Sequence, residues 1–124
     1  MTKKEELMYG NKLLFLNEVV TFSNISQIRE DGIFWIKTIE PKIDSKSFHF
    51  KPIPLTEEWL LKFGFFKHNN AYVLEKPNEN IMNFKFSIWS DFTYNSSEFP
   101  VELKYVHQLQ NLYFALTGTH LKLK

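Results

Sequence analysis

One segment, Pro54–Phe65 (PLTEEWLLKFGF), carries helix start and stop signals at its two ends. Thr56 is a natural N-cap, and the two glutamates after it lie where the helix dipole favours negative charge. Gly64 suits the left-handed position that ends a helix, and Phe65 would then contact Leu60, as in a Schellman motif. A helix of about two turns is not stable alone in water. The segment therefore predicts a short helix that packs against a sheet supplied by the rest of the chain.

The stretch before this helix, residues 8–53, is typical of short antiparallel strands. KLLFLN and EVVTFSNI are rich in residues that favour strands, and Asn17-Glu18 between them predicts a tight turn. Asp31-Gly32 is a strong signal for a two-residue hairpin turn. Side chains after this turn alternate, so that one side is predicted to carry Ile33, Trp35, Lys37 and Ile39 and the other Phe34, Ile36 and Thr38.

The region after the short helix, residues 71–105, again predicts strands. NAYVLEK and NFKFSIWS are joined by the turn-rich PNEN, FTYNSSEFP predicts a loop, and VELKY alternates between apolar and charged residues. A C-terminal helix is predicted over 106–117, with Gly118 as its stop signal. We expect the whole chain, 1–124, to form one α+β domain. In it, a small antiparallel sheet with barrel-like strands packs against the short helix (54–65) and the C-terminal helix.

Composition and charge restrict the classes of function. The 124 residues include 15 basic and 14 acidic side chains, whereas a general nucleic-acid binder usually shows a clear basic excess. Aromatic residues make up 17% of the chain, which indicates a core built largely from rings. The absence of cysteine excludes disulfides, thiolate zinc sites and a cysteine nucleophile. No apolar run reaches the length of a membrane span, so we expect a soluble, cytoplasmic protein.

The predicted C-terminal helix has two stripes of interest. At about 100° per residue, the stripe expected to face the core contains Val106, Leu109, Leu112, Tyr113 and Leu116. A stripe on the far side contains His107, Gln110, Asn111 and Phe114. We interpret this second stripe, together with Lys122 and Lys124 of the basic C-terminal tail, as a partner-binding surface. The alternative is structural, because polar groups on a core helix commonly serve to satisfy hydrogen bonds.

Residues that could carry chemistry are sparse. The four histidines are scattered and the four glycines form no phosphate-binding loop, so neither a metal nor a cofactor is expected. One pattern resembles metal-dependent nucleases, in which Asp91 and Glu102 would hold magnesium while Lys104 orients a water. Any exposed edge strand produces the same alternation. We therefore predict no catalytic residue, with a nuclease as an alternative.

Three segments, taken together, resemble a known group of proteins. LMYGN (7–11), IPLTEEWLLKFGF (53–65) and KYVHQLQNLYFALTG (104–118) are similar, in order and spacing, to small, mostly uncharacterised proteins encoded by phages and mobile elements of Bacteroidetes bacteria. The resemblance brings no catalytic residues with it. Members of that family often end in acidic residues, whereas this chain ends in THLKLK. We interpret the basic tail as a phosphate-contacting end.

The resemblance implies a non-enzymatic binding protein, since small proteins of mobile elements commonly act by occupying a host protein's surface. We expect a stoichiometric anti-defence inhibitor, specifically an anti-CRISPR protein that binds an RNA-guided nuclease or its guide RNA. Its partner would be a host or effector protein, with or without bound RNA, and neither a membrane nor a small-molecule substrate is expected. A small RNA-binding module is a further alternative. In it, the N-terminal strands form an SH3-like or OB-like barrel and exposed aromatics such as Phe34 stack on bases.

Overall fold

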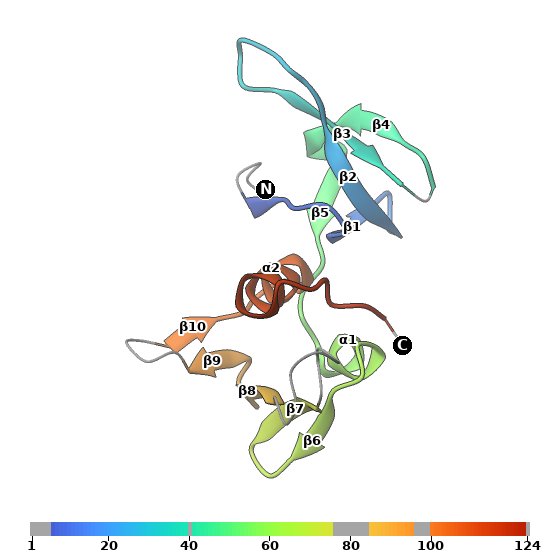
Figure 1. The fold of residues 1–124 in the computed structure, drawn as a ribbon. Coiled ribbons are helices and arrows are strands. Elements are labelled where there is room, and N and C mark those ends of the chain that lie inside the picture. The colour runs from blue at the N-terminus through green and yellow to red at the C-terminus, as the bar shows by residue number, and fades with distance from the viewer. Residues whose placement is uncertain (1–5, 40, 76–84, 96–99, 124) are drawn as a thin grey trace. The chain divides into compact units, whose positions relative to one another are not determined.

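The computed structural model describes residues 6–39, 41–75, 85–95 and 100–123. Within these residues the fold is α+β, as predicted, with ten strands in antiparallel sheets and two α-helices (Figure 1). No helix among them is both long and apolar enough to cross a membrane. The chain forms two compact units, and we name them the N-terminal unit (Met1–Ile53 with Tyr105–His107) and the C-terminal unit (Pro54–Lys104 with Gln108–Lys124).

The N-terminal unit is built on a five-stranded antiparallel sheet with the strand order β4-β3-β2-β1-β5 (Figure 1). Its elements are β1 (Lys12–Phe15), β2 (Glu18–Ile28), β3 (Phe34–Thr38), β4 (Asp44–Lys46), the 3₁₀ helix η2 (Ser47–His49) and β5 (Phe50–Pro52). β4 and β5 are the two edge strands, and no pairing within the described residues joins them. The described residues therefore do not form the SH3-like or OB-like barrel of the RNA-binding alternative, because the short β4 pairs with β3 alone and leaves the sheet open.

The hairpin β1–β2 closes through a two-residue turn at Leu16 and Asn17. Phe15 pairs with Glu18, and the two turn residues have positive φ angles of 48° and 70°. Such turns match the right-handed twist of the flanking strands. Asparagine tolerates this conformation well, whereas leucine adopts it only with strain. The turn predicted at Asn17-Glu18 is thus one residue too late, because the preference of leucine for extended structure assigned Leu16 to the strand.

The connection between β2 and β3 is longer than the two-residue turn predicted at Asp31-Gly32. Residues 29–33 separate the strands. The Arg29 N–H donates to the carbonyl of Ile33 at 2.8 Å, and the Gly32 N–H donates to the carbonyl of Arg29 at 3.1 Å. Gly32 has a φ of 89°, so a turn does lie at the predicted glycine, inside a wider loop.

The alternation predicted along β3 is confirmed. Phe34, Ile36 and Thr38 are buried, whereas Trp35 is half-buried and Lys37 is exposed. The core of the N-terminal unit consists of Leu13, Val20, Phe22, Phe34, Ile36 and Phe50. One side of β3 therefore packs on this core, and the other side faces the surface of the unit.

In the C-terminal unit, helix α1 (Glu57–Lys62) has the predicted caps. The Thr56 hydroxyl accepts a hydrogen bond of 3.4 Å from a backbone N–H of the first turn. At the other end, Gly64 has a φ of 97°, and the Phe65 N–H donates to the carbonyl of Leu60 at 3.0 Å, the closing bond of a Schellman motif. Leu60 and Phe65 are both buried, so packing stabilises this short helix, as predicted.

The rest of the C-terminal unit contains a three-stranded sheet, a separate hairpin and most of helix α2. The elements are β6 (Phe66–His68), β7 (Ala71–Glu75), β8 (Lys85–Trp89), β9 (Thr93–Asn95), β10 (Pro100–Glu102) and α2 (Val106–Thr117). β9 lies in FTYNSSEFP, and the prediction of a loop is wrong there, because Tyr94 stacks on the buried ring of Phe86 with 5.5 Å between centroids. Helix α2 gives way to Gly118, at a φ of 72°, as predicted.

Candidate functional site

Helix α2 is rotated relative to the orientation predicted from its sequence. His107 and Gln110, expected on the outward stripe, are buried, with 1% and 7% of their surfaces exposed. Leu116, expected in the core, is 45% exposed. The prediction is wrong here because it gave every leucine a core position, whereas the buried arc is centred on Val106 and Tyr113.

His107 has an unusual environment for a buried polar side chain. Neither ring nitrogen has a hydrogen-bond partner among the described residues. The ring stacks on Tyr105, with 5.9 Å between centroids and 10° between planes. Burial lowers the pKa of His107 from its ordinary value, and the charge of Glu6 acts in the opposite direction. His107 is therefore an interior, neutral ring, and in this conformation it offers no contact to an external partner.

The other predicted partner-binding residues are more accessible. Asn111 and Phe114 are half-buried and Lys122 is exposed, while Lys124 lies outside the described residues. Phe114 stacks on His120, with 4.6 Å between ring centroids, and this contact ties the tail to α2. A partner-binding role for the accessible residues remains a prediction.

The three residues of the alternative nuclease site are all exposed. Asp91 accepts a hydrogen bond of 3.2 Å from the Thr93 N–H, and Glu102 is the register partner of Thr93 across β9 and β10. The Lys104 N–H donates to the side chain of Gln108 at 2.9 Å. In the part of the chain that the structure describes, no group of three or more His, Asp or Glu is placed to hold a metal ion. The structure thus places Asp91 in the turn before β9 and Glu102 on β10, and nuclease activity stays a prediction.

The outer side of β2, β3 and β4 carries a second set of polar and aromatic residues. In antiparallel strands, directly opposite residues project to the same side of the sheet. Two rows cross these strands: Gln27, Trp35 and Lys46 form one, and Asn24, Lys37 and Asp44 form the other. The sequence placed Trp35 and Lys37 together, but their neighbours on β2 and β4 come from the register between strands.

Lys46 lies between two aromatic rings. Its Nζ is 5.7 Å from the centroid of the Trp35 ring and 5.8 Å from that of Phe48, distances at which a cation is attracted to a ring face. Phe48 is 52% exposed, and its ring contacts His49 with 4.4 Å between centroids. The strands predicted over residues 8–53 did not single out Phe48. The turn of η2 leaves Phe48 exposed while Phe50 enters the core.

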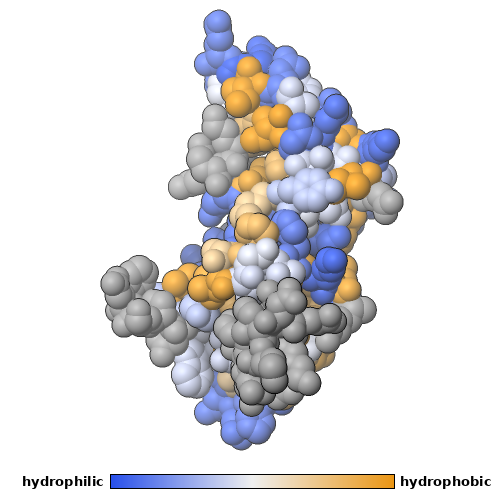
Figure 2. Space-filling model, viewed as in Figure 1, coloured by the Kyte–Doolittle hydropathy of each residue, from blue (hydrophilic) through white to orange (hydrophobic). Residues whose placement is uncertain are grey.

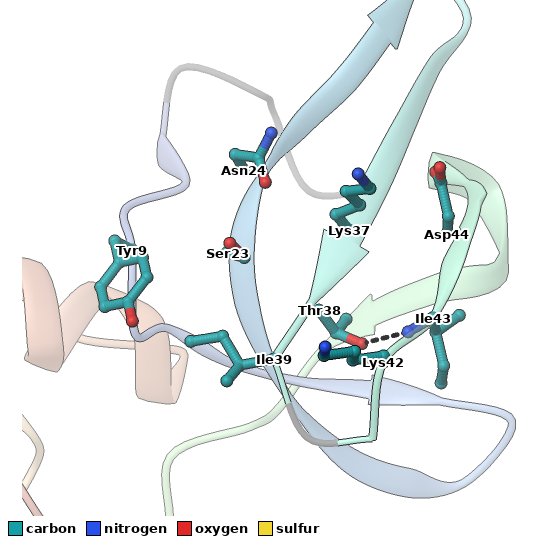
Figure 3. A pocket seen from close by; sticks show the side chains of 9 residues that line it. All are labelled: Tyr9, Ser23, Asn24, Lys37, Thr38, Ile39, Lys42, Ile43 and Asp44. Atoms are coloured by element: carbon teal, nitrogen blue, oxygen red, sulfur yellow. Dashed lines mark hydrogen bonds between the residues drawn. The ribbon is translucent and has the colours of Figure 1, made fainter.

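A shallow groove of about 520 Å³ adjoins the row that contains Lys37 (Figure 3). Residues of β2, β3 and the loop leading into β4 line it, and Tyr9 lies at its other side. The Thr38 hydroxyl accepts a hydrogen bond of 2.9 Å from the Ile43 N–H and donates one to the carbonyl of Pro41, which fixes this loop. The polar lining includes Ser23, Asn24, Lys37, Lys42 and Asp44.

Positive charge on this side of the sheet is incompletely neutralised. Among the described residues, Lys37, Lys42 and Lys46 form no ion pair with a carboxylate. Asp44 accepts a hydrogen bond of 2.7 Å from the Ser26 hydroxyl. In Figure 2, the visible surface of the N-terminal unit mixes hydrophilic residues with smaller hydrophobic patches. We define the lysine–aromatic face as Trp35, Lys37, Lys42, Lys46 and Phe48.

No match to this chain was found among models of protein families, curated proteins or solved structures. The resemblance of segments 53–65 and 104–118 to proteins of phages and mobile elements therefore remains a prediction. The lysine–aromatic face is accordingly identified from its residues and their geometry.

Proposed function

We propose that this protein is a non-catalytic binding protein that associates stoichiometrically with a macromolecular partner through the lysine–aromatic face. One observation supports this function above others. Lys46 is flanked by the exposed ring of Phe48 and the half-buried ring of Trp35, and it forms no ion pair among the described residues. Aromatic and cationic side chains are the anchors that dominate the binding energy of many interfaces.

Trp35, Lys46 and Phe48 lie outside the core cluster of the N-terminal unit. The core of the N-terminal unit lies on the opposite side of β3, where Phe34 and Ile36 are buried. An interface of standard size covers about 800 Å² on each partner. The outer side of β2, β3 and β4, with the adjoining groove, is the region on which such an interface would be centred. Trp35 and Phe48 would then be the anchors, and the lysines would steer the partner.

The specific form of this function is an anti-defence inhibitor, an anti-CRISPR protein that binds an RNA-guided nuclease or its guide RNA in the cytoplasm of a bacterial host. The resemblance of segments 53–65 and 104–118 to phage and mobile-element proteins supports it. In this form Asn111, Phe114 and Lys122 supply further contacts. Binding through the lysine–aromatic face does not depend on this particular partner.

Co-purification with RNA-guided nucleases, with and without guide RNA, tests both the anti-CRISPR function and binding through the lysine–aromatic face. The wild-type protein is expected to bind one of these nucleases and to reduce interference in cells, and the Lys37→Glu/Lys46→Glu variant is expected to lose both effects. Lys62→Glu/Lys67→Glu, in the C-terminal unit, is the matched control and should behave like the wild type. Failure to bind any nuclease contradicts the anti-CRISPR form. Unchanged binding by the Lys37→Glu/Lys46→Glu variant contradicts the role of the face.

A metal-dependent nuclease is the second candidate, and the support for it is that Thr93 donates a hydrogen bond to Asp91 and is the register partner of Glu102. Their carboxylates are the kind of ligand that magnesium prefers, and Lys104 would orient the attacking water. Magnesium-dependent cleavage of RNA or DNA that disappears in Glu102→Gln is the expected result for this function. Cleavage that persists in Glu102→Gln excludes this site as its source.

A further inference from the structure

We propose that the partner bound by the lysine–aromatic face is a single-stranded nucleic acid. This inference rests on the proposed function, because it uses the same surface and names the class of partner. Single strands are bound by exposed aromatic rings, on which bases stack, together with cationic side chains that follow the phosphates. Both kinds of group lie on the outer side of β2, β3 and β4.

The rings of this region are accessible to bases. Phe48 is 52% exposed, and the half-buried Trp35 lies on the outer side of β3. Tyr9, at the far side of the groove, is a third ring and is 59% exposed. Stacking accepts any base, because every base has a π-face. We therefore expect little sequence preference.

Three lysines supply positive charge for the phosphates. The Nζ of Lys46 is within 6 Å of the Trp35 and Phe48 ring centroids. When Lys46 binds a phosphate, the base of the same nucleotide therefore lies next to one of these two rings. Lys37 is two residues from Trp35 on the same side of β3, a separation of about 6.6 Å along a strand. Lys42 lies farther along the groove (Figure 3). The charges thus follow a path across the surface, as a chain of phosphates requires.

Asp44 places one negative charge within this path. Its hydrogen bond from Ser26 partly satisfies the carboxylate, and the three lysines outnumber it by two charges. Contact with two or three phosphates gives a slope of log affinity against log salt of about −1.4 to −2.1 for a single strand. The face therefore predicts salt-dependent binding with a shallow slope.

A duplex fits this surface less well than a single strand. In a duplex, the faces of the bases are stacked on one another and are not accessible to Trp35 or Phe48. Binding of a duplex without sequence preference relies on a broad basic surface, whereas the whole chain has a net charge of +1. A protein partner would use the same rings as anchors, so direct binding of an isolated single strand distinguishes a nucleic acid from a protein.

Fluorescence anisotropy tests this inference with the full chain and labelled RNA and DNA single strands of about 12 nucleotides. Single strands are expected to bind at least tenfold more tightly than a duplex of the same sequence. Trp35→Ala and Phe48→Ala should each weaken binding by roughly fivefold or more, since each removes a stacking platform. Lys37→Glu/Lys46→Glu should weaken it at least tenfold, and its salt slope should be shallower by about 1.4.

Matched variants in the C-terminal unit serve as controls. Trp59→Ala and Lys62→Glu alter a second lysine–tryptophan pair and should change the affinity less than twofold. Trp35→Tyr and Phe48→Tyr keep a ring at each position and should retain binding, which separates loss of stacking from loss of folding. Circular dichroism establishes that each variant is folded.

Absence of saturable binding by single strands overturns the inference, and so does equal binding by the wild type and the folded ring variants. If single strands do not bind but Lys37→Glu/Lys46→Glu still abolishes co-purification with a protein, the partner is that protein and the proposed function stands. If this variant co-purifies as the wild type does, the proposed function fails as well.

Discussion

Two lysines of this protein each lie over a tryptophan, and the two pairs differ in the charge around them. The Nζ of Lys46, in the N-terminal unit, is 5.7 Å from the Trp35 ring, and that of Lys62, on α1, is 5.0 Å from the Trp59 ring. Lys62 also forms an ion pair of 3.4 Å with Glu58, whereas Lys46 has none with a described carboxylate. The same local contact is therefore neutralised in one region and open to an anion in the other.

The two lysines differ because a helix brings together residues that are close in sequence, whereas a sheet brings together residues from different strands. Glu58 and Lys62 are four residues apart on α1, so the helix itself brings them together, and its dipole favours glutamate in the first turn. The neighbours of Lys46 are set by the register between β4 and β3. On α1 the compensating charge comes from the same helix, whereas on the lysine–aromatic face Asp44 is the register partner of Lys37 and Lys46 forms no ion pair with a described carboxylate.

The largest expected effect is on stability, and it should differ between the buried and the outer side of β3. Ile36→Ala removes a core side chain that is 1% exposed and should lower the free energy of unfolding by about 3 kcal/mol. Trp35→Ala, on the outer side, should lower it by less than half as much. Urea unfolding followed by circular dichroism measures both losses. Equal losses would mean that Trp35 serves folding, and the proposed binding role would lose its basis.

The second effect depends on pH and concerns His107. Burial lowers its pKa in the folded state below the ordinary value of 6.5, so the unfolded chain binds more protons as the pH falls. Stability should be steady above about pH 7.5 and should decline through pH 6.5, by up to about 1.4 kcal/mol per pH unit. Urea unfolding at several pH values measures this decline.

His107→Leu is the control for this pH effect, because it fills the same interior position without a titrating group. The variant should lose most of the decline in stability between about pH 7.5 and 5.5. An equal decline in the variant and the wild type would contradict a neutral, buried His107.

A third effect is confined to α1. Thr56→Ala removes the acceptor for a backbone N–H of the first turn and should lower the free energy of unfolding by about 1 kcal/mol, whereas Thr56→Ser should retain it. Thermal unfolding measures the loss. Single-strand affinity should remain within twofold of the wild type, because the cap lies in the C-terminal unit. A larger change in affinity would show that the two regions are energetically coupled.

The smallest effect concerns the ion pair that distinguishes the two lysines. A double-mutant cycle on Glu58 and Lys62 should give a coupling of about 0.3–0.5 kcal/mol that disappears near 1 M salt. Lys46→Met should show no salt-dependent loss of stability relative to the wild type. A loss that salt suppresses would reveal a carboxylate beside Lys46 and would remove the contrast between the pairs.

Features encoded within one turn or one strand were predictable from the sequence. The N-cap at Thr56 and the Schellman ending at Gly64 involve residues a few positions apart, and both are present. The two-residue period of a strand placed Trp35 and Lys37 on one side of β3, and the structure shows that this is the outer side. Two of the five residues of the lysine–aromatic face were therefore predicted to share one side of a strand.

The placement of Lys46 and Phe48 was not predictable in this way. β4 consists of Asp44, Ser45 and Lys46, which have little preference for strands, so its pairing with β3 has no local signal. Phe48 is exposed only because η2 interrupts the extended segment. The rotation of α2 has the same origin, since helical spacing defines stripes but the surrounding packing decides which stripe is buried.

The order in which the ribosome makes this chain does not match the order of its units. The N-terminal unit runs to Ile53 and is completed by Tyr105–His107, after almost all the strands of the other unit. This late segment of the N-terminal unit makes a hydrogen bond of 2.8 Å from the Val106 N–H to the carbonyl of Ile53. During synthesis, the N-terminal unit therefore stays incomplete until the start of α2 has left the ribosome. A fragment cut before residue 105 would leave the Ile53 carbonyl without its donor.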